Sequence, residues 1–84
     1  MEIVFSEQAW EDFQYWIKTD RKTLARIIRL IEAIDRDPYA GIGKPEPLKH
    51  ALSGTWSRRI DEVHRIVYEV SEDQLRLAQL RYHY

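Results

Sequence analysis

The stretch that decides the fold is residues 53–82, SGTWSRRIDEVHRIVYEVSEDQLRLAQLRY. Its Ser53-Gly54 pair marks a turn, and runs rich in β-branched, aromatic and aliphatic residues follow. These runs lie at residues 56–60, 64–70 and 74–82. The links between them are short and acidic. Strands joined by such short links pair in antiparallel fashion, so this stretch predicts a three-stranded meander.

The N-terminal half of the chain reads as a strand followed by two helices. Residues 2–5 predict a short strand, and apolar residues then recur at helical spacing up to Ile34. Ser6 and Asp20 stand where helix N-caps belong, so we expect one helix after each of them. Pro38 ends the second helix, because the residue before a proline avoids the helical region. A break as short as Thr19-Asp20 predicts a helical hairpin.

The expected architecture is therefore α+β, in the order β-α-α-β-β-β. An antiparallel sheet carries the helical hairpin on one face, and its other face can remain open. The 84 residues are expected to form a single domain, 1–84. A chain of this size can bury roughly 60–65% of its unfolded surface. Residues 39–52 are expected to be a loop.

Composition excludes several classes of protein. The chain has no cysteine, which rules out disulfides and thiolate metal sites and fits a reducing cytoplasm. No apolar run approaches the ~18 residues of a membrane span, and no leader is evident, so we expect a soluble cytoplasmic protein. The net charge of −1 argues against free-standing, non-specific nucleic-acid binding.

Polar groups gather in residues 44–68 and again at the C-terminus, residues 82–84. Glu46 lies between Pro45 and Pro47, which restrict its backbone and direct its side chain. Lysines, arginines and histidines follow. Such a set suits a phosphodiester, with cations to hold phosphate and a carboxylate and an imidazole to move protons. The alternative is an ordinary hairpin with a solvated charged face.

Other chemistries have less support. The three histidines lack the mutual spacing of metal ligands, so no metal or other cofactor is expected. Residues 41–44, GIGK, lack the flanking glycine and the following Ser/Thr of a phosphate-binding loop. Ser53-Gly54 does not supply the elbow of a serine nucleophile. Acid–base chemistry on RNA and simple partner binding both remain open.

Several motifs together resemble one family. They are KPEPLKH at 44–50, LSG at 52–54, WSRRI at 56–60, EVHRIVY at 62–68 and RYHY at 81–84, with SEQAWED at 6–12 and YWIKTD at 15–20. In sequence and spacing they resemble the YoeB-type toxins of the RelE/ParE superfamily over essentially the whole chain. The resemblance implies a RelE-like fold and the toxin of a type II toxin–antitoxin system. It also implies a metal-independent endoribonuclease that cuts mRNA in the ribosomal A site. The implied partners are a YefM-like antitoxin and a second copy of the chain.

The resemblance also implies residue roles. Glu46 would be the general base for the 2′-hydroxyl, Arg65 the cation that stabilises charge on the phosphate, and His83 the general acid for the leaving 5′-oxygen. The remaining implied site residues are Tyr84, which orients RNA, and the RNA-binding candidates Lys49, His50 and Arg59.

Two other interpretations stay open. A ParE-like toxin shares the fold but acts on a protein such as gyrase, and a non-catalytic binding module would need no acid–base set. His64 precedes Arg65 directly, so on a strand it points to the opposite face. We therefore expect His64 to be structural.

Overall fold

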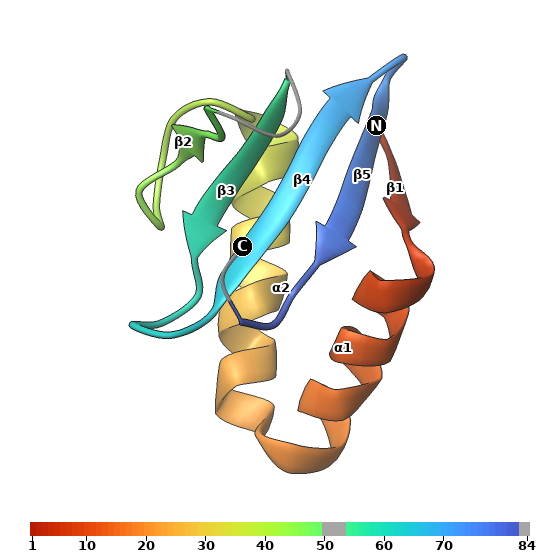
Figure 1. Ribbon diagram of the computed structural model, residues 1–84, viewed down its shortest axis with the longest axis vertical. Helices are drawn as coiled ribbons and strands as arrows, with labels where there is room; N and C mark the ends of the chain where they lie inside the picture. The colour runs from red at the N-terminus through yellow and green to blue at the C-terminus, as the bar shows by residue number, and fades with distance from the viewer. Residues whose placement is uncertain (50–53, 83–84) are drawn as a thin grey trace.

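The computed structural model describes residues 1–49 and 54–82, and these form five strands and two helices (Figure 1). In chain order the elements are β1 (Glu2–Phe5), α1 (Glu7–Thr19), α2 (Arg21–Arg36), β2 (Glu46–Pro47), β3 (Thr55–Arg59), β4 (Arg65–Ser71) and β5 (Gln74–Gln79). Among these residues no helix is long and apolar enough to cross a membrane.

The helices begin and end where the sequence predicted. The Ser6 side chain accepts from Ala9 N at 3.0 Å at the start of α1. Asp20 Oδ1 accepts from Thr23 N at 3.1 Å at the start of α2. These cap bonds satisfy backbone donors that the first turn of a helix otherwise leaves open. The N-caps and the helical hairpin are thereby confirmed.

The sheet has the strand order β1-β5-β4-β3-β2. The predicted meander is confirmed, since β3, β4 and β5 pair antiparallel. The sheet as a whole is mixed, however, because β1 runs parallel to β5, with Glu2 opposite Gln74 and Phe5 opposite Leu77. The expectation of a purely antiparallel sheet was therefore wrong at this one edge. A parallel neighbour requires a crossover connection, and the two helices with the intervening strands supply it.

Two further boundaries differ from the sequence prediction. The expected loop 39–52 contains the two-residue strand β2, which pairs antiparallel with β3. The last strand ends at Gln79 and does not continue to Tyr82. Side chains from α1 bind both backbone groups of Leu80 and so compete with ladder pairing.

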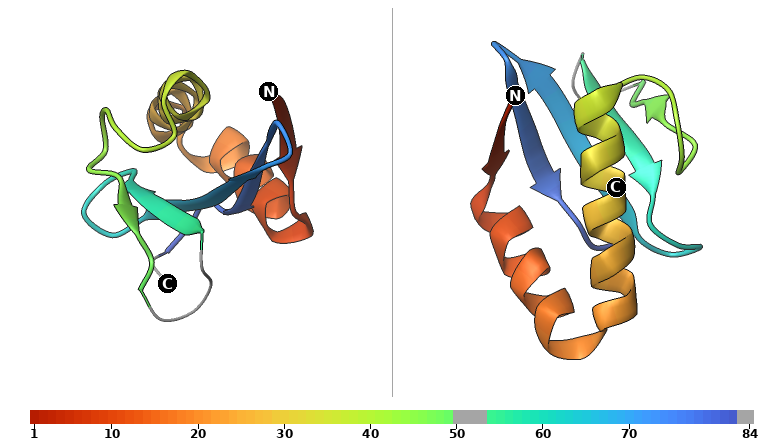
Figure 2. Two further views of the ribbon diagram at one scale, coloured as in Figure 1. Left: turned by 90° about the horizontal axis from the view of Figure 1, so that it is seen from above. Right: turned by 180° about the vertical axis from the view of Figure 1, so that it is seen from behind.

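Both helices cover one face of the sheet and leave the other open (Figure 2). The core lies between the layers and includes Ile27, Leu30 and Ile34 of α2. Ile66, Tyr68, Leu75 and Leu77 of the sheet face them. Because side chains alternate along a strand, Arg65, Val67 and Glu69 of β4 then lie on the open face. The polar residues of β3 and β4 are thus divided between the open face and the face that the helices cover.

Candidate functional site

An acidic and a basic side chain meet on the open face of the sheet. Glu46 of β2 and Arg65 of β4 form an ion pair between Oε1 and Nη2. The Arg65 side chain is 14% exposed, while that of Glu46 is 51% exposed. The Arg65 guanidinium is therefore largely buried in the surface of the protein, and the more exposed Glu46 carboxylate contacts it from the solvent side.

The position of Arg65 is set by the strand beside it. Its Nε donates to Ser57 Oγ at 3.2 Å, and Ser57 is fully buried. Ser57 also lies opposite Glu46 in the β2–β3 pairing. A guanidinium held by a fixed hydroxyl and a carboxylate has little rotational freedom, because its planar fork is pre-organised for two such contacts. This arrangement presents a directed positive charge on the open face.

Backbone pairing keeps Glu46 in place. Arg59 N donates to Gly43 O at 2.7 Å, and Leu48 N donates to Thr55 O at 2.9 Å, so β3 holds the chain on both sides of β2. Gly43 has φ +84°, and a Cβ there would lie 2.7 Å from Leu30 Cδ2. The positive φ favours glycine at this position, and a Cβ there would also require the Leu30 side chain to shift. β2 is an edge strand, where prolines are tolerated.

A second arginine lies directly across the sheet from the first. Arg59 is opposite Arg65 in the β3–β4 register, and alternation places it on the same open face. Like charges directly opposite each other destabilise a sheet. Arg59 is exposed, and so is Lys49, two residues beyond β2. The structure therefore brings Glu46, Arg59 and Arg65 to one surface.

Three of the predicted site residues, His50, His83 and Tyr84, lie outside the described residues. His64 is described. Its Nδ1 accepts from Tyr82 N at 2.7 Å, and its ring meets Trp16 edge-on at a centroid distance of 4.9 Å. These contacts agree with the structural role expected for His64. Within residues 1–49 and 54–82, no group of three His, Cys, Asp or Glu side chains could hold a metal ion.

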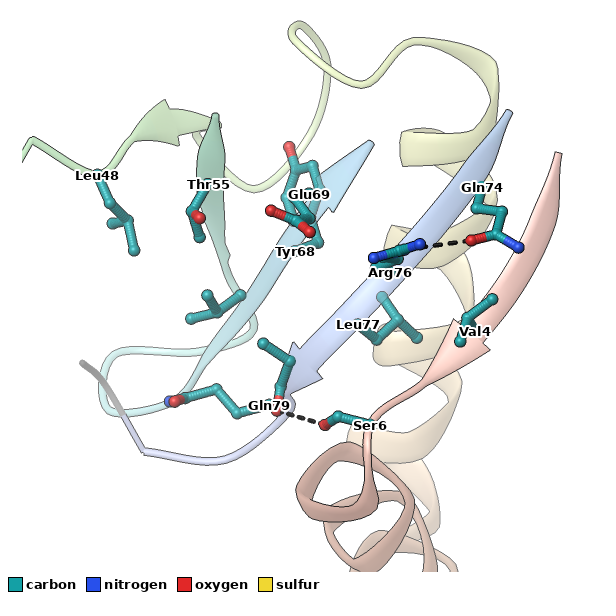
Figure 3. A pocket seen from close by; sticks show the side chains of 12 residues that line it. Val4, Ser6, Leu48, Thr55, Tyr68, Glu69, Gln74, Arg76, Leu77 and Gln79 are labelled. Carbon is teal, nitrogen blue, oxygen red and sulfur yellow. Dashed lines mark hydrogen bonds between the residues drawn. The ribbon is translucent and has the colours of Figure 1, made fainter. Parts of the chain in front are cut away.

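An apolar groove of about 560 Å³ extends over the same open face (Figure 3). Val4, Leu48 and Val67 contribute to its walls, and Gln74 and Arg76 lie at one end. Neither Glu46 nor Arg65 lines it. The open face therefore has two parts, a charged area across β2, β3 and β4 and an apolar groove that extends from Leu48 and β3 across β4 and β5 to β1.

Residues 5–84 match the model of the YoeB-like toxin of bacterial type II toxin–antitoxin systems. The chain belongs to the YoeB-like toxin family. It is 57% identical to the toxin YoeB of Streptomyces coelicolor over 84 residues, which is the whole of both chains. It also resembles the solved YoeB dimer from Staphylococcus aureus, with a TM-score of 0.94, 45% identity and coverage of 100% of this chain and 98% of that one. The heterotetrameric YoeB–YefM complex from the same organism gives a TM-score of 0.91, 45% identity and the same coverage.

The RelE-like fold implied by the resemblance is confirmed by these YoeB structures, which match this chain over its full length. The sequence motifs identified Glu46 and Arg65 as candidate site residues, but they did not show that the two side chains are in contact. Their ion pair is a finding of the structure.

Sequence reasoning missed the residues that support the site. Arg58 is fully buried on the helix-facing side of β3. Its guanidinium donates to the carbonyls of Asp37 at 2.6 Å and of Ala40 and Ile42 at 3.1 Å, and its Nε donates to Tyr68 Oη at 3.2 Å. It thereby fastens the segment before β2 to the sheet. Strand alternation could have found it, because Arg58 and Arg59 must face opposite sides.

Proposed function

We propose that this chain, as one domain, is the toxin of a type II toxin–antitoxin system and a ribosome-dependent endoribonuclease. Its substrate is mRNA in the ribosomal A site, and cleavage there stops translation. The observation that carries this proposal is the ion pair of Glu46 and Arg65 on the open face, with Arg65 oriented by Ser57. It places a proton acceptor beside a fixed cation, which cleavage of a phosphodiester needs.

In the proposed reaction the Glu46 carboxylate takes the proton from the 2′-hydroxyl. The 2′-oxygen forms a bond to phosphorus while the bond to the 5′-oxygen breaks, which leaves a 2′,3′-cyclic phosphate. His83 gives its proton to the departing 5′-oxygen, and Arg65 stabilises the charge that develops on the phosphate. Tyr84 orients the RNA at this point. Every step uses groups of the chain and the RNA, so no metal is required.

The resting ion pair must open during this reaction. Guanidinium binds phosphate as well as carboxylate, in both cases through paired N–H donors. An incoming phosphate therefore competes with Glu46 for Arg65, and its arrival releases the carboxylate toward the 2′-hydroxyl. Arg59 and Lys49 add positive charge around this point, and we assign them with His50 to holding the RNA backbone.

The net charge explains why the ribosome is needed. Affinity for the RNA backbone comes largely from neutralisation of its phosphates by lysine and arginine. A chain of net charge −1 has no excess positive charge for this purpose. The ribosome presents the mRNA at high local concentration and in a fixed geometry. We expect efficient cleavage on programmed ribosomes and little cleavage of naked RNA at physiological salt.

The test compares matched variants in single-turnover cleavage of mRNA on programmed ribosomes. Glu46→Gln, Arg65→Gln and His83→Ala should each slow cleavage by roughly 10²-fold or more, as for loss of a general acid, a base or a charge stabiliser. Glu72→Gln and Arg29→Gln remove the same charges at exposed positions in the β4–β5 turn and on α2, so they should leave the rate unchanged. Wild-type protein that binds gyrase and leaves ribosomal mRNA intact would instead support the ParE-like alternative. Inertness in both assays would support a binding module.

We also propose that a YefM-like antitoxin and a second copy of the chain bind this toxin, as the names of the two Staphylococcus aureus structures state for their proteins. The apolar groove beside the charged area offers an antitoxin segment an apolar surface. Sedimentation of the purified chain, alone and with its antitoxin, measures both associations. A chain that sediments as a monomer both alone and in the presence of its antitoxin would contradict this proposal.

A further inference from the structure

The segment that leads to the end of the chain, residues 80–82, is held by side chains that are distant in sequence. Leu80 N donates to Asp12 Oδ2 at 2.9 Å, and Trp16 Nε1 donates to Leu80 O at 2.9 Å. Helix α1 thereby binds both backbone groups of one residue. All three residues are almost fully buried, with exposures of 0% for Leu80, 2% for Asp12 and 5% for Trp16.

Asp12 is an unusual residue for such a position. Burial of a carboxylate is unfavourable unless hydrogen bonds compensate it. Here Gln8 Nε2 donates to Oδ1 at 2.8 Å and Leu80 N donates to Oδ2. An aliphatic side chain would fill the same place on α1 at lower cost, but it could not accept from Leu80. The buried carboxylate is explained by its hold on residue 80.

Tyr82 is held in the same way, two residues further on. Its N donates to His64 Nδ1 at 2.7 Å, and its O accepts from Arg65 N at 2.8 Å. Tyr82 has φ +62°, a left-handed conformation that is uncommon for a bulky residue. Such a conformation persists only where the surrounding structure over-determines it. The two hydrogen bonds do this for Tyr82.

These contacts form one connected unit, because the His64 ring also packs edge-on against Trp16. We propose that Asp12, Trp16 and His64, here called the tail clamp, are positioning residues for the last two residues of the chain. The inference rests on the proposed function and extends it to residues outside the charged area. Chain ends fray unless they are tied down, whereas catalytic groups must be held within about 0.5 Å.

Arg65 connects the clamp to the charged area. Its side chain pairs with Glu46, and its backbone N–H holds Tyr82. Tyr82, the residue before His83, is therefore bound to the same residue that would stabilise the phosphate. Loosening the clamp moves the chain end relative to Arg65 and leaves the Glu46–Arg65 pair intact.

A pair of substitutions at His64 separates hydrogen bonding from packing. His64→Asn keeps an acceptor near the position of Nδ1 and loses the ring. His64→Phe keeps a ring against Trp16 and loses the acceptor. Ile34→Val is the control, since Ile34 is fully buried in α2 and far in sequence from the clamp, and its loss of a methyl group tests the effect of lowered stability alone.

Single-turnover cleavage on programmed ribosomes is measured at increasing toxin concentration. The maximal rate of His64→Phe should fall by roughly 10-fold to 10²-fold, as for a catalytic group misplaced by about 1 Å, while half-saturation changes little. His64→Asn should retain most of the rate, and Ile34→Val all of it. Wild-type rates in His64→Phe, or an equal loss in His64→Phe and His64→Asn, would overturn the proposal. An equal loss in Ile34→Val would do so as well.

Amide hydrogen exchange gives a readout that does not depend on cleavage. The N–H of Tyr82 should lose protection in His64→Phe and keep it in His64→Asn. If wild-type protein fails to cut ribosomal mRNA, the proposed function is refuted, and exchange at Tyr82 still decides whether the clamp holds the tail. Unchanged protection in His64→Phe would refute the clamp.

Discussion

Replacement of Arg58 by methionine should destabilise the protein strongly, although Arg58 lies in neither the charged area nor the tail clamp. The side chain is fully buried and makes four hydrogen bonds, three to carbonyls of residues 37–42 and one to Tyr68 Oη. Methionine has a similar length and fills much of the space. It leaves those acceptors without their charged donor.

The expected magnitude is a balance of two large terms. Hydrogen bonds from a charged donor contribute about 1.5–3 kcal/mol each, so four bonds amount to roughly 6–12 kcal/mol. Burial of the guanidinium costs several kcal/mol, which methionine avoids, and the carbonyls of the loop regain some water. We expect a net loss of about 3 kcal/mol. For a domain of this size that lowers Tm by roughly 12–24 °C.

Urea unfolding followed by tryptophan fluorescence measures this change, because the chain has three tryptophans. The midpoint should fall while the slope m stays constant. Arg58→Lys is the matched control, since lysine keeps the charge but cannot span four acceptors, and it should lie between wild type and Arg58→Met. If Arg58→Met unfolds at the wild-type midpoint, desolvation cancels the hydrogen bonds and Arg58 does not fasten the loop.

Two further predictions concern the N-cap of α2 and the ends of the chain. The hydrogen bond from Thr23 N lowers the pKa of Asp20 below its usual value of 3.8, so the stabilisation from this cap is fully present above that value and is lost as pH falls below 3.8. Asp20→Asn should therefore show a smaller fall of Tm on acidification in this range than wild type, and parallel Tm curves would contradict the assignment. A C-terminal affinity tag should abolish most cleavage on ribosomes and leave Tm nearly unchanged, whereas the same tag at Met1 should be harmless. Equal activity of the two tagged forms would exclude a catalytic role for residues 83–84.

The parts of the fold that sequence predicted are those with local causes. Ser6 and Asp20 cap helices through bonds to residues three positions away. The meander follows from short links between strands. The parallel pairing of residues 2–5 with 74–77 has no local signal, because the partners are 72 residues apart. The strand β2 was missed because its two residues include a proline, which is rarely found in strands.

In the candidate site, too, the features with local causes could be predicted and those that depend on distant contacts could not. The residue types at Glu46, Arg59 and Arg65 could be read from the sequence together with their chemistry. Their supports could not, since Ser57 and Asp12 act through contacts that depend on strand register and helix packing. The roles of all the site residues, His50, His83 and Tyr84 among them, remain predictions from the resemblance.

The parallel pairing of β1 with β5 also governs when the protein can finish folding. Residues 2–5 are made well before their partners at 74–77, which lie 72 positions further along the chain. Contacts so distant in sequence form late, because the chain between them must be closed first. The β1–β5 edge of the sheet and the anchoring of Leu80 to α1 must both wait until residues 74–80 have been made. A growing chain that has not yet reached residue 74 therefore lacks β5 and the β1 edge of the open face.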